Sequence, residues 1–384
     1  MARYSLLLSI CILLTGCQET YSNNREEAPT PQPAAMQPVP LRPAFATQPV
    51  GSDPDDPAIW VHPSQPQLSL ILGTDKEAAP SGGLFVYDLD GNVVQKISPL
   101  DRPNNVDVEH GMRLGDGQFA DIAVVTERYR KWLRVYRIDP ATRRLSEISA
   151  PKGIPVFEGQ TGEASEPMGI ALYRRPADGV VFAIVGRKTG PSGNYLWQYR
   201  LEAATTGAVR GIKVREFGDY SGRKEIEAIA VDDDLGYVYY ADETFGVHKY
   251  HADPDHKEAK RELALFATSG FRGDHEGIAI YRGVDGRGFL ICTDQIEDNS
   301  LYYLYRREGE PGDPHNHRPI AVVSGGADST DGLDVVSSPM GSRFPHGLMV
   351  AMNSRSRNFL VYDWNEIAAV VPKTTQESRS GAPK

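Results

Sequence analysis

The segment Leu84-Phe85-Val86-Tyr87 is a short apolar run that ends in tyrosine, and it recurs along the chain. Two further apolar runs, Ala58–Val61 and Leu70–Thr74, precede it and have the length and composition of β-strands. The same order of three runs returns five more times, and successive tyrosines are 49 to 63 residues apart. The other tyrosines of the series are Tyr136, Tyr199, Tyr250, Tyr305 and Tyr362.

Six repeats of this kind predict an all-β fold, a six-bladed β-propeller that forms one domain. The 37 glycines and 28 prolines among 384 residues supply many turns, and no window has the long 3.6-residue period of an amphipathic helix. A pair of β-sandwiches or an open tandem array could also be built from such repeats. The closed ring is favoured because an open array would leave long unpaired strand edges.

The first residues have the features of an export signal. Arg3 precedes an apolar run, residues 6–14, that is too short to span a bilayer. The four residues that end this run, LTGC at positions 14–17, resemble a bacterial lipobox, which implies removal of residues 1–16 and lipidation of Cys17. Gln18 after the cysteine is similar to the outer-membrane sorting signal of Gram-negative lipoproteins. An ordinary cleaved signal peptide is the alternative.

Three further boundaries follow from composition. Residues 17–50 are rich in proline and poor in large apolar side chains, so they predict a semi-extended tether. Residues 51–370 contain the repeats, and residues 371–384 predict a frayed polar tail. We therefore expect a monomeric propeller that contacts the membrane only through its lipid anchor.

The overall charge excludes one class of partner. The chain has 51 Asp and Glu against 41 Lys and Arg, a formal net charge of −10, whereas nucleic-acid binding needs clustered cations. Its three cysteines are too few for a disulfide framework or a cysteine-rich zinc site.

Acidic residues recur where the first strand of each repeat begins. In a propeller these strands surround a central channel, so side chains at equivalent positions meet at one end of it. Hard oxygen ligands gathered in this way suit Ca²⁺, which takes 6–8 of them. Loop capping by individual Asp and Asn residues is the alternative. The six positions are Asp56, Asn105, Met168, Glu227, Glu276 and Asp331, with further acids nearby at Asp53, Asp55, Asp107, Glu225, Asp274 and Asp334.

A second set of equivalent positions follows the second strand of each repeat. It holds Lys76, Arg128 and Lys188 in the first three repeats and Glu243 in the fourth. Cations beside a bound metal are what a phosphate ester needs, since Arg offers a fork and Lys a point charge to phosphate oxygens. Surface salt bridges with neighbouring acids are the alternative.

Five motifs, in this order, resemble those of the β-propeller phytases over essentially the whole of residues 50–368. They are DPDDPAIW at 53–60, NNVD at 104–107, EIEAIA at 225–230, DHEGI at 274–278 and STDGLD at 329–334. The resemblance implies a calcium-dependent 3-phytase, a phosphoric monoester hydrolase. Its substrate would be myo-inositol hexakisphosphate (phytate), presented as the calcium salt.

The resemblance also assigns roles to residues. The implied calcium ligands are Asp55, Asp56, Glu227, Glu243, Asp274, Glu276, Asp331 and the backbone carbonyl of Met168. Lys76, Arg128 and Lys188 match phosphate-binding cations. Glu77 departs from the family, which has a second lysine after Lys76.

These assignments lead to a mechanistic hypothesis. Paired Ca²⁺ ions, held by acids that include Asp56 and Glu227, orient a bridging water on phosphorus without a phosphoenzyme. Lys76 and Arg128 neutralise the equatorial oxygens, and Lys188 holds a neighbouring phosphate. Two alternatives are a calcium-dependent propeller that hydrolyses another ester, such as a lactone, and a non-catalytic scaffold.

Overall fold

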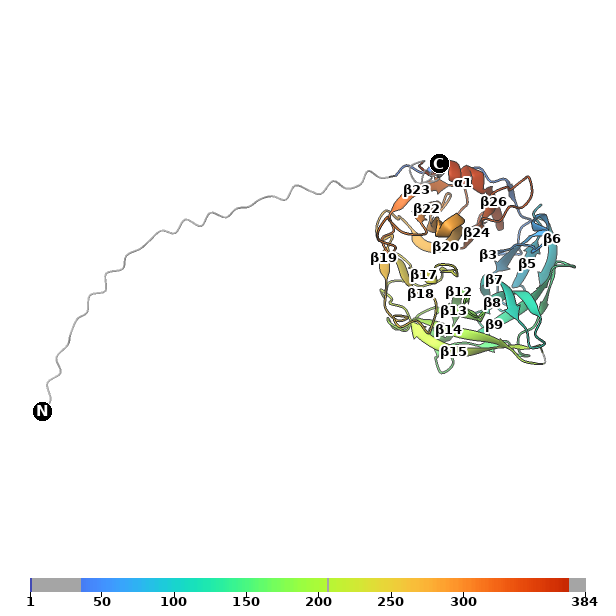
Figure 1. Ribbon diagram of the computed structural model, residues 1–384, viewed down its shortest axis with the longest axis horizontal. Coiled ribbons are helices and arrows are strands. Elements are labelled where there is room, and N and C mark those ends of the chain that lie inside the picture. The colour runs from blue at the N-terminus through green and yellow to red at the C-terminus, as the bar shows by residue number, and fades with distance from the viewer. Residues whose placement is uncertain (2–35, 206, 373–384) are drawn as a thin grey trace, which may run out of the picture. The chain divides into compact units, whose positions relative to one another are not determined.

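The computed structural model describes Met1 and residues 36–205 and 207–372, and it confirms the six-bladed β-propeller. The strands form six sheets arranged as a ring around a central axis (Figure 1). We number the sheets as blades 1 to 6 in chain order. Within each blade, consecutive strands pair antiparallel from the channel outward.

The strand bounds in the first three blades are as follows. Blade 1 contains β3 (Pro54–Trp60), β4 (Leu70–Asp75), β5 (Gly83–Tyr87) and β6 (Val93–Ile97). Blade 2 contains β7 (Pro103–Arg113), β8 (Phe119–Glu127), β9 (Trp132–Asp139), β10 (Arg144–Glu147) and the short β11 (Ile154–Pro155). Blade 3 contains β12 (Pro167–Arg174), β13 (Val181–Arg187), β14 (Leu196–Ala203) and β15 (Val209–Phe217).

The last three blades complete the ring. Blade 4 contains β16 (Ile229–Asp232), β17 (Tyr237–Asp242), β18 (Gly246–His251) and β19 (Ala264–Phe266). Blade 5 contains β20 (Asp274–Arg282), β21 (Gly288–Gln295), β22 (Leu301–Arg306) and β23 (Pro319–Ser324). Blade 6 contains β24 (Leu333–Val336), β25 (Leu348–Asn353) and β26 (Asn358–Asp363). The helical elements are η1 (Pro66–Leu68), η2 (Gly162–Ser165), η3 (Val284–Gly286) and α1 (Trp364–Val370).

Two short N-terminal strands close the ring, which corrects the predicted extent of the tether. β2 (Phe45–Ala46) pairs antiparallel with β26 and is the outer strand of blade 6, while β1 (Val39–Pro40) pairs parallel with β23 of blade 5. Leu41 and Val50 are buried beside them. Residues 36–50 therefore belong to the propeller. Their two strands form backbone hydrogen bonds with strand edges of blades 5 and 6 that would otherwise be unpaired. The predicted signal peptide and Cys17 lie outside the described residues.

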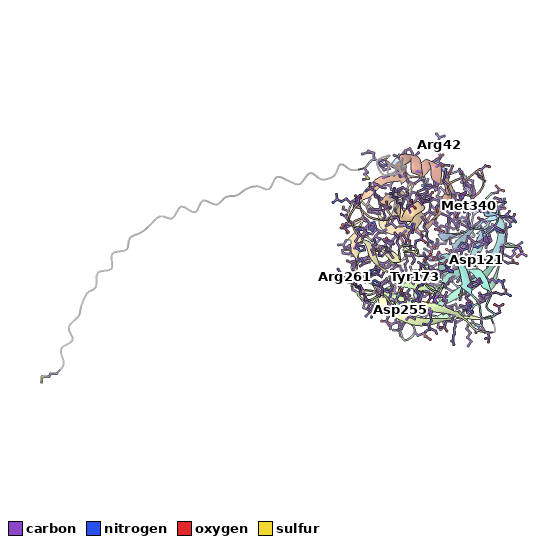
Figure 2. All side chains as sticks on the ribbon, in the orientation of Figure 1. Arg42, Asp121, Tyr173, Asp255, Arg261 and Met340 are labelled. Atoms are coloured by element: carbon purple, nitrogen blue, oxygen red, sulfur yellow. The ribbon has the colours of Figure 1, made fainter. Side chains whose placement is uncertain are left out.

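The core consists of six apolar clusters, each between two neighbouring blades. Side chains fill these spaces between the sheets (Figure 2). In β4, Leu70 and Leu72 pack toward blade 2, and Ile71 packs toward blade 6. Successive strand residues face opposite sides, so a strand buried on both faces is apolar throughout. This explains the continuous apolar runs in the sequence.

The six tyrosines of the repeat are all buried, which agrees with a packing role. In the part of the chain that the structure describes, no helix has the length and apolarity needed to cross a membrane.

Candidate functional site

The innermost strands β3, β7, β12, β16, β20 and β24 contact one another in ring order. They enclose a cavity of about 400 Å³ that is lined by residues from all six blades. The polar side chains predicted at the starts of these strands lie toward one end of this channel. The site is therefore built where six equivalent strands begin.

Irregular backbone sets the direction of these side chains. The pairing of four inner strands with the next strand shifts register at the same place, which leaves residues 55–56, 104–105, 168–169 and 276–277 out of the ladder. In blades 4 and 6 the inner strand begins just after Glu227 and Asp331. A bulge re-aims a side chain that regular pleating would direct elsewhere. The positions identified from the sequence are thus those where the regular ladder has not yet begun.

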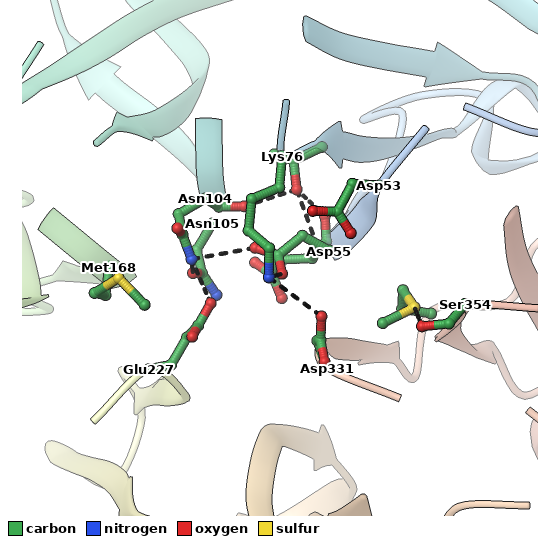
Figure 3. Close-up of polar contacts among 12 residues, drawn as sticks. Asp53, Asp55, Lys76, Asn104, Asn105, Met168, Glu227, Asp331 and Ser354 are labelled. Carbon is green, nitrogen blue, oxygen red and sulfur yellow. Dashed lines mark hydrogen bonds and ion pairs between the residues drawn. The ribbon is translucent and has the colours of Figure 1, made fainter. Parts of the chain in front are cut away.

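Lys76 lies at the centre of a group of polar side chains from four blades (Figure 3). Its Nζ forms an ion pair with Asp55 Oδ1 and lies 3.4 Å from Asp331 Oδ2. Asn104 Nδ2 donates to Asp55 Oδ2 at 3.2 Å and also to Glu227 Oε1. Asp55, Glu227 and Asp331, which are far apart in the sequence, are thereby held together.

Glu243 connects two groups of carboxylates beside this centre. One group is Glu225, Glu227 and Glu243, and the other is Glu243, Asp274 and Glu276. In each group the oxygen atoms lie within 4.8 Å of one another. Burial, followed by the charge of Glu227, raises the pKa of Glu243 to about 8. Like charges this close disfavour ionisation of each other unless a cation lies between them.

The same electrostatic situation extends to the neighbouring acids. Burial, with a further contribution from Asp55, raises the pKa of Glu227 to about 7. Burial raises the pKa of Asp55 to about 8, although Lys76 opposes the shift. The pKa of Glu276 is also raised, first by burial and then by Glu243. The site therefore concentrates negative charge that its own cations do not fully balance.

These residues fit a hard divalent cation. The donors are carboxylate and amide oxygens, which Ca²⁺ prefers. Asn104 Oδ1 is buried and has no hydrogen-bond partner among the described residues. Rotation of the Asn104 amide, whose Nδ2 faces Asp55 and Glu227, would turn this oxygen toward the carboxylates as a cation ligand. Sequence reasoning passed over Asn104 in favour of its neighbour Asn105.

Asp56 lines the channel, as Glu276 does, and also contacts the next blade. Its Oδ2 accepts a hydrogen bond from Val106 N at 3.0 Å in that blade. Asp107 makes the corresponding contact to Leu172 N at 2.6 Å, and Asp334 to Ile59 N at 2.7 Å. Asp107 and Asp334 therefore join neighbouring blades below the mouth of the channel.

Met168, whose backbone carbonyl the resemblance implies as a calcium ligand, lies at the start of β12. Its side chain is buried, and its carbonyl accepts a hydrogen bond from Thr126 Oγ1 at 2.7 Å. The second lone pair of that carbonyl remains for another donor or a cation.

The predicted phosphate-binding cations each have an acidic partner. Arg128 Nε lies 3.0 Å from Glu166 Oε2, and Lys188 Nζ pairs with Glu225. Sequence reasoning missed two further polar contacts of the predicted ligands, in which Lys224 pairs with Asp274 and Gln295 donates to Asp331. Gln295 could have been found, since it occupies the position equivalent to Lys76 in blade 5.

Buried acids at the ends of the second strands fix the loops that carry the ligands. Asp75 accepts backbone hydrogen bonds from residues 51–53, just before Asp55. Asp294 does the same for residues 272–273, just before Asp274. Asp242 accepts from the backbone and the hydroxyl of Ser221. These three aspartates position the loops that carry the predicted ligands. The sequence did not distinguish this role from that of a metal ligand.

A family model described as Phytase matches residues 11–376. The chain belongs to the phytase family. A curated relative, the 3-phytase of Bacillus subtilis (strain 168), is 31% identical over 342 residues, covering 84% of this chain and 83% of that protein. These comparisons confirm the predicted family and its class, the phosphoric monoester hydrolases. They support the phytase prediction over the lactonase and scaffold alternatives.

A solved structure, the β-propeller domain of Cps50 (Swd1) from Myceliophteria thermophila, also resembles this phytase. It has 10% sequence identity and a TM-score of 0.43, over 77% of this chain and 80% of that one. The six-bladed fold itself rests on the sheet topology given above.

Proposed function

We propose that this phytase hydrolyses phosphomonoesters of myo-inositol hexakisphosphate with the help of Ca²⁺. The observation that carries the proposal is the pair of carboxylate groups that share Glu243. These carboxylates lie at the channel mouth together with the cations Lys76, Arg128 and Lys188. The acids come from blades 4, 5, 6 and 1, and the three cations come from blades 1, 2 and 3. A polyanionic substrate that binds together with divalent cations needs both sets of side chains, the acids for the cations and the basic residues for the phosphates.

Asp55, Glu227, Glu243, Asp274, Glu276 and Asp331 would hold the metal, together with Asp56 and the carbonyl of Met168. A bound divalent cation would neutralise phosphoryl oxygens and lower the pKa of water. No covalent enzyme intermediate is needed, because water attacks phosphorus directly and the P–O bond to the inositol breaks.

The protein's own groups supply the remaining steps. Lys76 and Arg128 hold the phosphoryl oxygens of the reacting group and offset the charge that develops on them. Glu227 accepts a proton from the attacking water at the carboxylate oxygen that does not bind Asn104, and the inositol oxygen takes up a proton as its bond to phosphorus breaks. Lys188 holds a neighbouring phosphate.

The test uses the purified chain from residue 18. Phosphate release from phytate should be lost in a chelator and restored by Ca²⁺. Glu227→Ala and Asp56→Ala should abolish turnover while the circular dichroism spectrum stays that of a β-propeller. Full activity in the chelator would refute the metal dependence, and full activity of Glu227→Ala would refute its role.

We also propose that the enzyme is exported and anchored to the outer membrane through Cys17. The proposal is supported by the LTGC sequence at positions 14–17 and by Gln18. Growth with labelled palmitate should label the wild-type protein but not Cys17→Ser, and fractionation should recover only the wild type with outer membranes. Equal labelling of both proteins would refute the anchor.

A further inference from the structure

Arg102 lies between the two proposed phosphate-binding cations of blades 1 and 2. It occupies the loop between β6 and β7, and its backbone N–H donates to Glu77 O at 2.9 Å. Its carbonyl accepts from Arg128 N at 3.0 Å. Its guanidinium Nη1 donates to the backbone oxygen of Lys76 at 3.2 Å. Arg102 is thus attached to both loops that carry these cations.

Arg102 differs from the neighbouring cations in forming no ion pair with a carboxylate of the described residues, although its charge acts on Asp53, where it opposes the rise in pKa that burial causes. Lys76, Arg128 and Lys188 all form ion pairs with carboxylates. Within residues 36–205 and 207–372, no carboxylate lies within 4.0 Å of the Arg102 guanidinium, and its Nε is buried without a hydrogen-bond partner. Since Nη1 donates to the Lys76 backbone oxygen and Nε is buried, Nη2 is the nitrogen of the Arg102 guanidinium that remains for a ligand.

The surroundings of Arg102 fix the orientation of its side chain. The guanidinium carbon lies 5.6 Å from the centre of the Tyr129 ring, and Tyr129 is half exposed at the rim. Stacking on an aromatic face holds a guanidinium plane while leaving its edge open. Arg102 has a backbone φ of 59°, in the left-handed region that L-residues rarely adopt. Strained backbone of this kind is concentrated at functional sites.

We propose that Arg102 binds a further phosphate group of the substrate, besides the reacting one held by Lys76 and Arg128 and the neighbouring one held by Lys188. Glu77, which directly follows Lys76, places a negative charge on this part of the rim, and Arg102 supplies a cation beside it. The fork of a guanidinium can bind two oxygens of one phosphate. The inference rests on the proposed function and deepens it, since Arg102 would select substrates that carry neighbouring phosphates.

The experiment compares a substrate with many phosphates to one with a single phosphate. Arg102→Gln and Arg102→Lys are assayed with phytate and with p-nitrophenyl phosphate in saturating Ca²⁺. The control is Arg210→Gln, an exposed arginine on the outer strand of blade 3 that pairs with Glu202. Arg102→Gln should raise KM for phytate about tenfold or more, the effect of losing a charged hydrogen bond, and leave kcat and all p-nitrophenyl phosphate constants unchanged. Arg102→Lys should be intermediate.

A binding measurement gives a readout that does not depend on turnover. Calorimetry with myo-inositol hexasulfate should show an affinity that falls by a similar factor in Arg102→Gln and is unchanged in Arg210→Gln. If the wild type releases no phosphate from phytate, the proposed function fails, while the hexasulfate titration still tests whether Arg102 binds a polyanion.

Two results would overturn the role of Arg102 in an active enzyme. One is an unchanged KM for phytate together with unchanged hexasulfate affinity. The other is an equal loss of kcat on both substrates, which would mean that Arg102 acts through the position of Lys76. If Arg102→Gln does not fold, Arg102→Lys decides, because it keeps the charge and removes the fork.

Discussion

Glu243→Gln should change the stability of the protein in opposite directions with and without calcium. Glu243 is almost fully buried and belongs to both carboxylate groups. Its pKa is raised from 4.5 to about 8, so the unfolded chain releases this proton at a lower pH than the folded protein does. The unfolded state therefore binds fewer protons between these values, and in the absence of metal the free energy of unfolding falls as pH rises from 4.5 through 8.

The expected magnitude follows from the shift. At pH 7 unfolding lets Glu243 ionise freely, which lowers the free energy of unfolding by about 3 kcal/mol relative to a neutral residue, from 1.36 kcal/mol per pKa unit. Glutamine has nearly the same shape and no charge. In a chelator, Glu243→Gln should therefore be more stable than the wild type by up to about 3 kcal/mol. For a domain of this size that corresponds to a rise of roughly 4 °C in Tm.

In calcium, the wild type should instead be more stable than Glu243→Gln. A ligand that binds only the folded state stabilises it by RT ln(1 + [L]/Kd), and Glu243→Gln removes a charged ligand from two groups. In millimolar Ca²⁺ the variant should melt below the wild type. The assay is thermal unfolding followed by circular dichroism at pH 7, in EGTA and in Ca²⁺, with the exposed Glu158→Gln as the control. A variant that is destabilised equally in both buffers would refute the reasoning, because Glu243 would then be only a structural residue.

Three other changes test separate parts of the structure. Lys188→Ala should raise KM for phytate about tenfold with a smaller effect on kcat, measured by phosphate release, because it removes one charged phosphate contact. A chain that begins at residue 36 should melt with the full-length protein, whereas one that begins at residue 51 should melt well below it, since it lacks β1 and β2. Asp294→Ala should destabilise the protein by about 1–3 kcal/mol in chemical denaturation and weaken calcium binding in titrations, because it leaves the amides of residues 272–273 unpaired.

The fold could be predicted because each blade repeats the same physical constraint. A strand buried on both faces must be apolar throughout, and this gives the runs that mark every unit, such as Leu70–Thr74. The positions of the acids could be predicted for a related reason. Equivalent residues in equivalent strands reach the same end of the channel, so register alone brought Glu227 and Asp331 to one place.

The repeat pattern could not predict which side chains of neighbouring blades contact one another. Asn104 binds both Asp55 and Glu227, and Arg102 reaches the backbone of Lys76, because the ring brings unlike loops together. Those contacts are not periodic. The closing strands were missed for the same reason. Two-residue strands in a proline-rich segment have no signal of their own, and they form only because β26 and β23 present unpaired edges.

The site also lies across the junction at which the chain closes on itself. Asp331 of blade 6 and Asp55 of blade 1 both contact Lys76, and Gly332 N donates to Asp55 O at 3.1 Å. The outer side of blade 6 is held by β2, whereas its inner side meets blade 1 at these acids. A cation bound by Asp55 and Asp331 would thus join the first and last blades at the channel, opposite the strand that joins them at the edge. Metal binding and ring closure would then stabilise each other, since each holds in place the blades that the other requires.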